Sequence, residues 1–328
     1  MTYSCRYYII ILCLSLLLTT FCTATAITQT YGVFDVTFYN IGDSDGENTG
    51  QSDWTSQQMD DVAGAIFEWQ SQIANVAGRQ IQMHLFWGNL NTLGGNMLGN
   101  SQSKKIEADG HVWNSVEYAW KAGQNPITSS YGYDTVIQLD SAAAGKSWNF
   151  GSDAPIEGEV DFRSIITHEI GHSLGWDSTY DKMFDDWGWM YTTRPYGLYG
   201  GLTAWDENLV DSSGNKPITR GKGTPGNFNQ TDDPVYFDGE NATALYGGLV
   251  PITAPATFSY ASSLLHLDEA TFGDMVMSSS IASGQMARTL SDLEWAMMED
   301  MGWTVVPEPS SVILMISAFG MLRLRSRK

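Results

Sequence analysis

The sequence predicts an α+β protein whose secondary structure changes in character along the chain. In the first half, short runs of alternating apolar residues are interspersed with stretches of helical spacing, which indicates strands and helices in turn. From about residue 178 to residue 260 the chain is rich in Gly, Asp, Asn, Thr and aromatic residues, with weak periodicity. Clear helical spacing returns near the end. We therefore expect one domain with a long, loop-rich insertion before its last helix.

The first half should contain a strand, a long helix and further strands. Residues 33–41 form the first expected strand, because apolar side chains alternate there with polar or smaller ones. Residues 53–76 place apolar residues at helical spacing, behind a Thr-Ser pair that can cap a helix. Residues 81–88 and 134–142 are further strand candidates.

The last helix is expected within residues 289–303. Ser291 and Glu294 have the spacing of a capping box, and Gly302 stands where a helix-terminating glycine belongs. The apolar stripe of this helix comprises Leu293, Met297 and Met301.

Both ends of the chain read as targeting segments. Arg6, an apolar run and the sequence CTATA predict a secretory signal peptide over residues 1–26. Residues 305–328 combine a Pro-Glu-Pro triplet, a short apolar segment and a basic tail, which indicates a hydrophobic anchor with a positive cytoplasmic end. The folded domain is then expected over residues 27–304.

The triplet Pro307, Glu308 and Pro309, with the segment that follows it, resembles the PEP-CTERM sorting signal of envelope-bearing bacteria. The resemblance implies recognition and cleavage by a membrane exosortase during export. The protein would then reside at the cell surface or in the extracellular matrix, and would meet the membrane only transiently through its terminal segments.

The composition narrows the possible partners. A hydrophobic fraction of 43% with 16% charged residues is typical of a folded domain. The formal net charge of −20 argues against nucleic-acid binding, which needs a basic surface.

All three cysteines lie within residues 1–26, so no disulfide is expected in the exported domain. Such a domain must rely on its core, with bound metal as a further source of stability.

The stretch ITHEIGHSLGWDS, residues 166–178, contains the candidate metal-binding and catalytic residues. His168 and His172 are four residues apart, so on a helix they share one face and can reach one metal ion about 2 Å away. Glu169 lies beside the first histidine, where it can accept a proton from water and pass it to a leaving amine. This pattern predicts a catalytic zinc site.

Gly175 follows the second histidine by three residues and permits the left-handed turn that reverses the chain. The pattern H-E-x-x-H-x-x-G resembles the metzincin zinc endopeptidases, in which a third ligand usually follows three residues after the glycine. That position holds Ser178, a poor zinc ligand, and Asp177 is one residue out of register.

His266 and the methionines after it resemble the leishmanolysin-like branch of that clan, in which a long insertion separates the glycine from the third histidine. The resemblance implies zinc on His168, His172 and His266, with Met277 or Met275 in a turn beneath the metal. It also implies two lobes flanking a cleft, a twisted mixed sheet and a long active-site helix. The substrate would be a protein or peptide.

Three other interpretations stay open at this stage. Glu207 and Asp211 fit the E-x-x-x-D element that supplies a glutamate ligand in gluzincin-type peptidases. The chain could instead be a non-catalytic surface or matrix protein with a structural metal site. The alternating carboxylates Asp43, Asp45 and Glu47 could hold calcium, although they lack the rest of an EF-hand loop.

Overall fold

A computed structural model describes the central part of the chain. The described residues are 26–90, 97–124, 132–178, 180–181, 189–190, 202–217, 234–255, 259, 262–273 and 275–306. The predicted signal peptide up to residue 25, the predicted sorting segment from residue 307 and much of the loop-rich stretch lie outside them. Within these ranges, no helix is both long and apolar enough to cross a bilayer.

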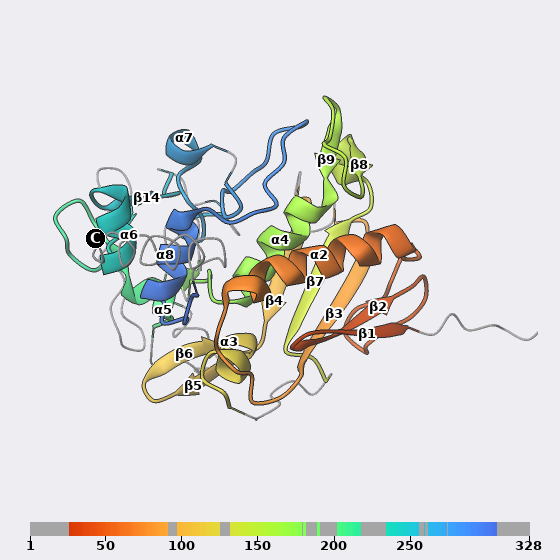
Figure 1. Ribbon diagram of the computed structural model, residues 1–328, viewed down its shortest axis with the longest axis horizontal. Coiled ribbons are helices and arrows are strands. Elements are labelled where there is room, and N and C mark those ends of the chain that lie inside the picture. The colour runs from red at the N-terminus through yellow and green to blue at the C-terminus, as the bar shows by residue number, and fades with distance from the viewer. Residues whose placement is uncertain are drawn as a thin grey trace, which may run out of the picture.

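A five-stranded mixed sheet forms one side of the molecule (Figure 1). Its strand order is β1-β2-β3-β7-β4, with the inner three strands parallel and the two outer strands antiparallel to their neighbours. The inner strands coincide with the three strands expected from the sequence. The sheet consists of β1 (Ile27–Tyr31), β2 (Phe34–Tyr39), β3 (Ile81–Gly88), β4 (Gly99–Ser103) and β7 (Thr135–Asp140).

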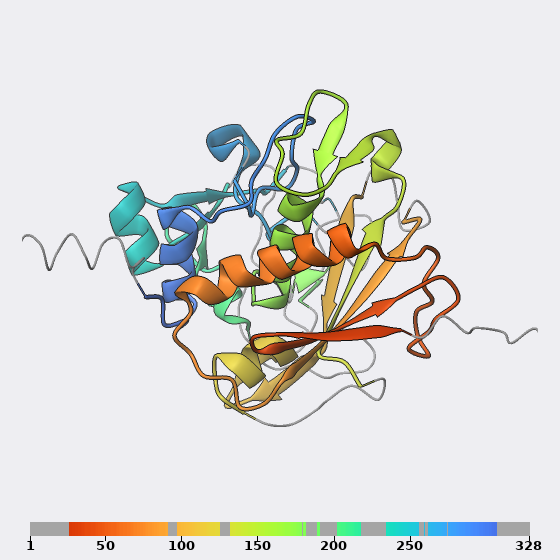
Figure 2. The same cartoon turned by 45° about the vertical axis from the view of Figure 1, so that its right-hand side comes forward.

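Two helices, α2 (Ser56–Gln72) and α4 (Phe162–Ser173), pack side by side over one face of this sheet (Figures 1 and 2). Thr55 caps α2 in a capping box. Asp161 caps α4 by accepting from the backbone amide of Ser164 at 2.9 Å, which satisfies an N–H group that the helix itself leaves free. The α+β class with a mixed sheet is therefore confirmed.

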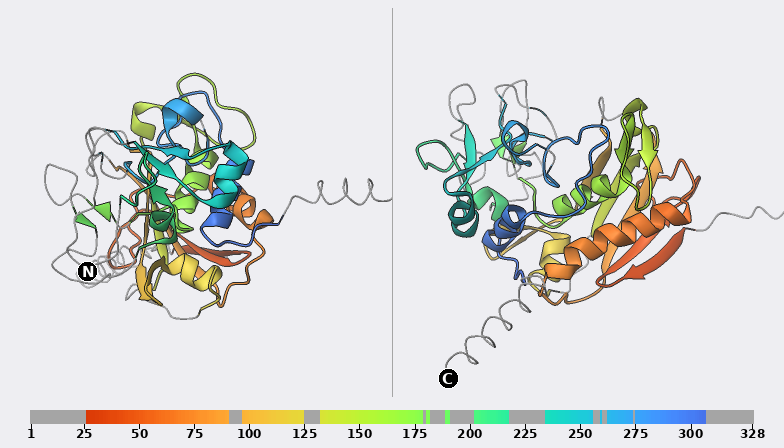
Figure 3. Two further views of the ribbon diagram at one scale, coloured as in Figure 1. Left: turned by 90° about the vertical axis from the view of Figure 1, so that its left-hand side faces the viewer. Right: turned by 45° about the horizontal axis from the view of Figure 1, so that its top comes forward.

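The C-terminal elements gather on the other side of α4 (Figures 1 and 3). The last helix, α8 (Asp292–Asp300), begins with the expected capping box between Ser291 and Glu294, and Gly302 after it has a φ of +88°. The remaining strands are β5 (Lys105–Ala108), β6 (His111–Asn114), β8 (Ser147–Asn149), β9 (Glu159–Asp161), β10 (Tyr180–Asp181), β11 (Trp189–Met190), β12 (Leu209–Val210), β13 (Val235–Phe237) and β14 (Val250–Ile252). The remaining α-helices are α3 (Ser115–Trp120), α5 (Ala204–Glu207), α6 (Glu240–Tyr246) and α7 (Glu269–Phe272).

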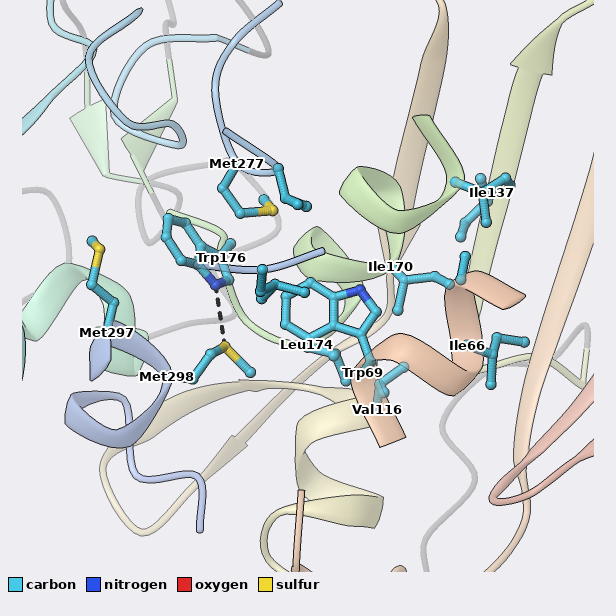
Figure 4. Packing of buried hydrophobic residues seen from close by; sticks show 14 of the residues in the cluster. Ile66, Trp69, Val116, Ile137, Ile170, Leu174, Trp176, Met277, Met297 and Met298 are labelled. Atoms are coloured by element: carbon cyan, nitrogen blue, oxygen red, sulfur yellow. Dashed lines mark hydrogen bonds between the residues drawn. The ribbon is translucent and has the colours of Figure 1, made fainter. Parts of the chain in front are cut away.

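One apolar core joins the two sides and holds α4 between them. Trp69 of α2 donates its indole N–H to the carbonyl of Thr167 in α4 at 2.9 Å and packs edge-on against Trp295 of α8. Trp176, just after α4, donates to the sulfur of Met298 at 3.2 Å (Figure 4). The helix that carries the histidine motif is thus fixed by buried contacts on both of its sides.

Candidate metal centre

Three histidines from distant parts of the chain meet at one point. His168 and His172 project from successive turns of α4, and His266 comes from a turn after β14. Their Nε2 atoms are 3.0 Å apart for His168 and His172, and 3.2 Å apart for each of the other two pairs. Within the described ranges they are the only group of His, Cys, Asp or Glu side chains arranged to hold a metal ion.

Each imidazole ring is oriented by a hydrogen bond from its other nitrogen. The three Nδ1 atoms pair with the backbone carbonyls of Val276, Trp176 and Ser262, at 2.7, 2.6 and 2.9 Å for His168, His172 and His266 respectively. A carbonyl oxygen has no proton to give, so every Nδ1 carries the hydrogen and donates it. All three Nε2 lone pairs are therefore free and directed toward the common point, the arrangement that a metal ligand needs.

The spacing and the charge state of the cluster both suit zinc. The point in the plane of the three nitrogens that is equidistant from them lies about 1.8 Å from each, so an ion slightly out of this plane can form zinc–imidazole bonds of 2.0–2.1 Å. Burial lowers the pKa of all three histidines. The pKa of His266 falls to about 3. Burial also holds the pKa of His172 well below its usual range, and the neighbouring imidazoles of His168 and His266 add to this shift. The rings are neutral at pH 7, as metal binding requires.

Glu169 is buried next to this cluster, with 5% of its surface exposed. Its carboxyl accepts a hydrogen bond from the backbone amide of Ser101 in β4, but burial is the larger influence and raises its pKa to about 8. A metal dication nearby would favour the ionised form and oppose this shift. Burial and a nearby metal ion thus shift the pKa of Glu169 in opposite directions, as expected of a group that accepts and releases protons.

The edge strand β4 passes directly over Glu169. A β-carbon added at Gly99 would lie 2.5 Å from the Oε1 atom of Glu169 and 2.9 Å from its Cδ and Cγ atoms. Only glycine allows this approach. This contact could not be predicted, because GNSQS is a polar segment without strand periodicity.

The cluster opens into a cavity of about 420 Å³ that runs along α4. One wall consists of residues 97–101, which lead into and form part of β4. The opposite wall includes Leu265, Val276 and residues 278–281. Glu169 and the three histidines line the cavity together, so a bound molecule could reach the metal position and the carboxyl group at once.

Gly175 makes the turn that the sequence predicted for it. Its φ is +108°, and a β-carbon there would lie 2.5 Å from the carboxyl group of Glu117, so both conformation and space require glycine. The reversal brings the carbonyl of Trp176 back to the Nδ1 atom of His172.

Of the two methionines considered from the sequence, Met277 packs against α4, the helix that carries His168 and His172. Figure 4 shows it among the buried hydrophobic residues around this helix. It is fully buried against Gly171 of α4, where an added β-carbon would lie 2.4 Å from the Met277 sulfur. Its backbone N–H donates to Glu294 of α8 at 2.8 Å. Met275 instead lines the cavity.

The other candidate ligands are engaged elsewhere. Asp177 lines the cavity but forms an ion pair with Lys105, and Glu207 pairs with His111 at 3.3 Å. Neither belongs to the histidine cluster. The Ser178 hydroxyl donates to Asp206 at 2.5 Å.

The loop considered for calcium forms hydrogen bonds to protein groups. Asp43 accepts from the backbone amide of Asn40, and Asp45 accepts from two backbone amides and contacts His84 at 3.1 Å. Glu47 accepts from the hydroxyl of Tyr133. Calcium binding at this loop stays a prediction, and these contacts lend it no support.

Comparisons with known proteins give no further information about this site. A scan against protein-family models finds no match, and searches of curated proteins and of solved structures find none either. The interpretation of the cluster therefore depends on its own chemistry.

Proposed function

We propose that this protein is a zinc-dependent endopeptidase of metzincin-like architecture. The observation that carries the proposal is the convergence of three neutral imidazole Nε2 atoms beside a buried carboxyl group, at the wall of an open cavity. A purely structural zinc site usually closes its fourth position with another protein ligand. Here the fourth side faces the cavity, and among the described residues the carboxyl group of Glu169 accepts one hydrogen bond, from the backbone amide of Ser101.

The chemistry divides between the ion and the chain. A zinc ion held by His168, His172 and His266 would supply Lewis acidity, which polarises a peptide carbonyl and makes water a usable nucleophile near neutral pH. Glu169 would accept the proton of the attacking water and deliver it to the leaving nitrogen. The Nδ1 hydrogen bonds hold the rings in place throughout.

Several features of the chain support the metzincin-like part of the proposal. The turn at Gly175, the distant third histidine and the buried Met277 occur in the order that the resemblance implies. The gluzincin interpretation gains no support, because Glu207 lies at the end of a four-residue helix and faces His111. Export and exosortase-dependent sorting belong to the same proposal and depend on the terminal segments alone.

The test measures zinc content and cleavage of casein by the wild type, His266→Ala and Glu169→Gln, with His111→Ala as a control histidine outside the cluster. We expect about one zinc ion per wild-type chain, loss of zinc in His266→Ala, and retained zinc without cleavage in Glu169→Gln. Undiminished activity in Glu169→Gln would refute the peptidase. One zinc ion without cleavage of any protein would favour a surface or matrix binding protein with a structural metal.

A further inference from the structure

A strained turn lies between β7 and β8. Ala143, Ala144 and Gly145 adopt φ values of +49°, +50° and +84° in succession. In this left-handed region the β-carbon of an alanine approaches its own backbone, so two alanines in sequence are unfavourable. Such strain persists only where the surroundings enforce it, and it is concentrated at functional sites.

The buried carboxylate of Asp140 enforces the turn. One of its oxygens accepts from the amide of Ala144 at 2.8 Å, and the other accepts from the amide of Leu90 at 3.1 Å. The amide of Lys146 donates to the carbonyl of Ala143 at 3.0 Å. The direction in which residue 146 leaves the turn is therefore fixed by the backbone.

The turn forms part of the wall of the metal-site cavity, through Ala144 and Lys146. It lies toward the start of α4, because β7 ends beside Leu98, where the amide of Asp140 donates to the Leu98 carbonyl at 2.9 Å. Farther along β4, the hydroxyl of Ser101 lies 2.8 Å from that of Ser173, the last residue of α4. Lys146 thus stands at the end of the cavity where Ser164 and Ile165 also line it.

Lys146 brings a positive charge to the edge of this cavity. The acidic groups of the lining are Asp177, which is paired with Lys105, and Glu169, which lies beside the histidine cluster. In the portion of the chain that the structure describes, Lys146 forms no ion pair. The Lys146 side chain is exposed, and its positive charge contrasts with the formal net charge of −20 of the whole chain.

We propose that Lys146 is a specificity-determining residue, which selects substrates that place a carboxylate at the end of the cavity near the start of α4. This inference rests on the proposed peptidase function and names the substrate class of that site. The carboxylate can belong to an aspartate or glutamate side chain, or to the C-terminus of the substrate. The strained turn fixes the backbone position from which the exposed Lys146 side chain borders the cavity.

The test uses pairs of quenched fluorescent peptides that differ only by glutamate or glutamine, with the position moved residue by residue on both sides of the cleaved bond. A second set compares peptides with a free C-terminal carboxylate and peptides with a C-terminal amide. This comparison distinguishes recognition of the C-terminus from recognition of an acidic side chain. At one position we expect kcat/KM to favour the carboxylate by roughly threefold to fivefold, the upper range of an exposed ion pair. The preference should weaken as salt is raised.

The variants make the assignment specific to one side chain. Lys146→Met should bring the ratio of the two kcat/KM values close to one, and Lys146→Arg should preserve the preference. Lys216→Met, which changes an exposed lysine paired with Asp238 outside the cavity lining, should leave the ratio as in the wild type. Dissociation constants of the same peptides with the Glu169→Gln protein should show the same preference without turnover.

Two outcomes would overturn the inference while the peptidase assignment survives. One is cleavage of every matched pair at equal rates by the wild type, and the other is an unchanged preference in Lys146→Met. If the wild type neither binds zinc nor cleaves any peptide, the proposed function itself fails, and the inference fails with it.

Discussion

Gly99→Ala tests whether the contact between β4 and Glu169 matters for chemistry. The added β-carbon would lie 2.5 Å from the Oε1 atom, and ordinary contact begins near 3.4 Å, so the carboxyl group must move by about 0.9 Å (3.4 − 2.5). The end of a side chain can turn away more easily than the sheet can shift. A displacement of about 1 Å of a catalytic group can cost roughly 100-fold in rate. Overpacking should typically cost about 1–3 kcal/mol of stability.

The assay compares kcat/KM, zinc content and thermal midpoint for wild type, Gly99→Ala and Gly248→Ala. Gly248 is the matched control, because a β-carbon there meets nothing within 4 Å and its φ is ordinary. We expect Gly99→Ala to keep its zinc and lose about two orders of magnitude in kcat/KM, while Gly248→Ala matches the wild type. If Gly99→Ala stays within threefold of the wild type while Glu169→Gln is inactive, the geometric reasoning is wrong.

Four further predictions concern the packing of Met277 against α4, the removal of the metal, the buried ion pair between Arg288 and Asp161, and the pH dependence of stability. Gly171→Ala drives a β-carbon to 2.4 Å from the Met277 sulfur, so zinc affinity measured by chelator competition should fall about tenfold; an unchanged affinity would separate Met277 from the site. Chelation of the wild type should lower the thermal midpoint by about 10 °C, for zinc at about 1,000 times its dissociation constant, and should have no effect on His266→Ala. Arg288→Met leaves the buried N-cap Asp161 without its partner and should cost about 3–5 kcal/mol in urea unfolding; a loss below 1 kcal/mol would contradict this. Burial lowers the pKa of His84, so the stability that depends on neutral His84 is present above pH 6.5 and is lost as pH falls below it. Between pH 7.5 and 5.5, metal-free His84→Gln should therefore lose less stability than the metal-free wild type. Equal losses in the two proteins would count against this.

The parts that could be predicted from the sequence are those with a local pattern. The inner strands β2, β3 and β7 are covered on both faces or nearly so, and their apolar runs reflect it. The spacing of His168 and His172 follows from helix geometry alone. The capping box of α8 is likewise a local pattern of two residues.

The features that could not be predicted from the sequence depend on contacts between residues that are distant in the chain. The helix predicted over residues 53–76 ends at Gln72, because Ile73 is extended and pairs with Val305 near the end of the described chain. The edge strands β1 and β4 have polar sequences without alternation, and only their neighbours make them strands. The seven-residue helix α6 lies within the loop-rich stretch and is too short for its periodicity to be recognised.

His266 is separated from His172 by 94 residues, and that distance has a consequence for the timing of assembly. A polypeptide emerging from the ribosome or through a membrane pore in the N-to-C direction exposes two of the three nitrogens early. The third arrives only after about four-fifths of the chain has been made. Closing so long a loop carries an entropic cost that the core contacts around α8 must first offset. The complete cluster is therefore a late event in folding, and a growing or truncated chain lacks it.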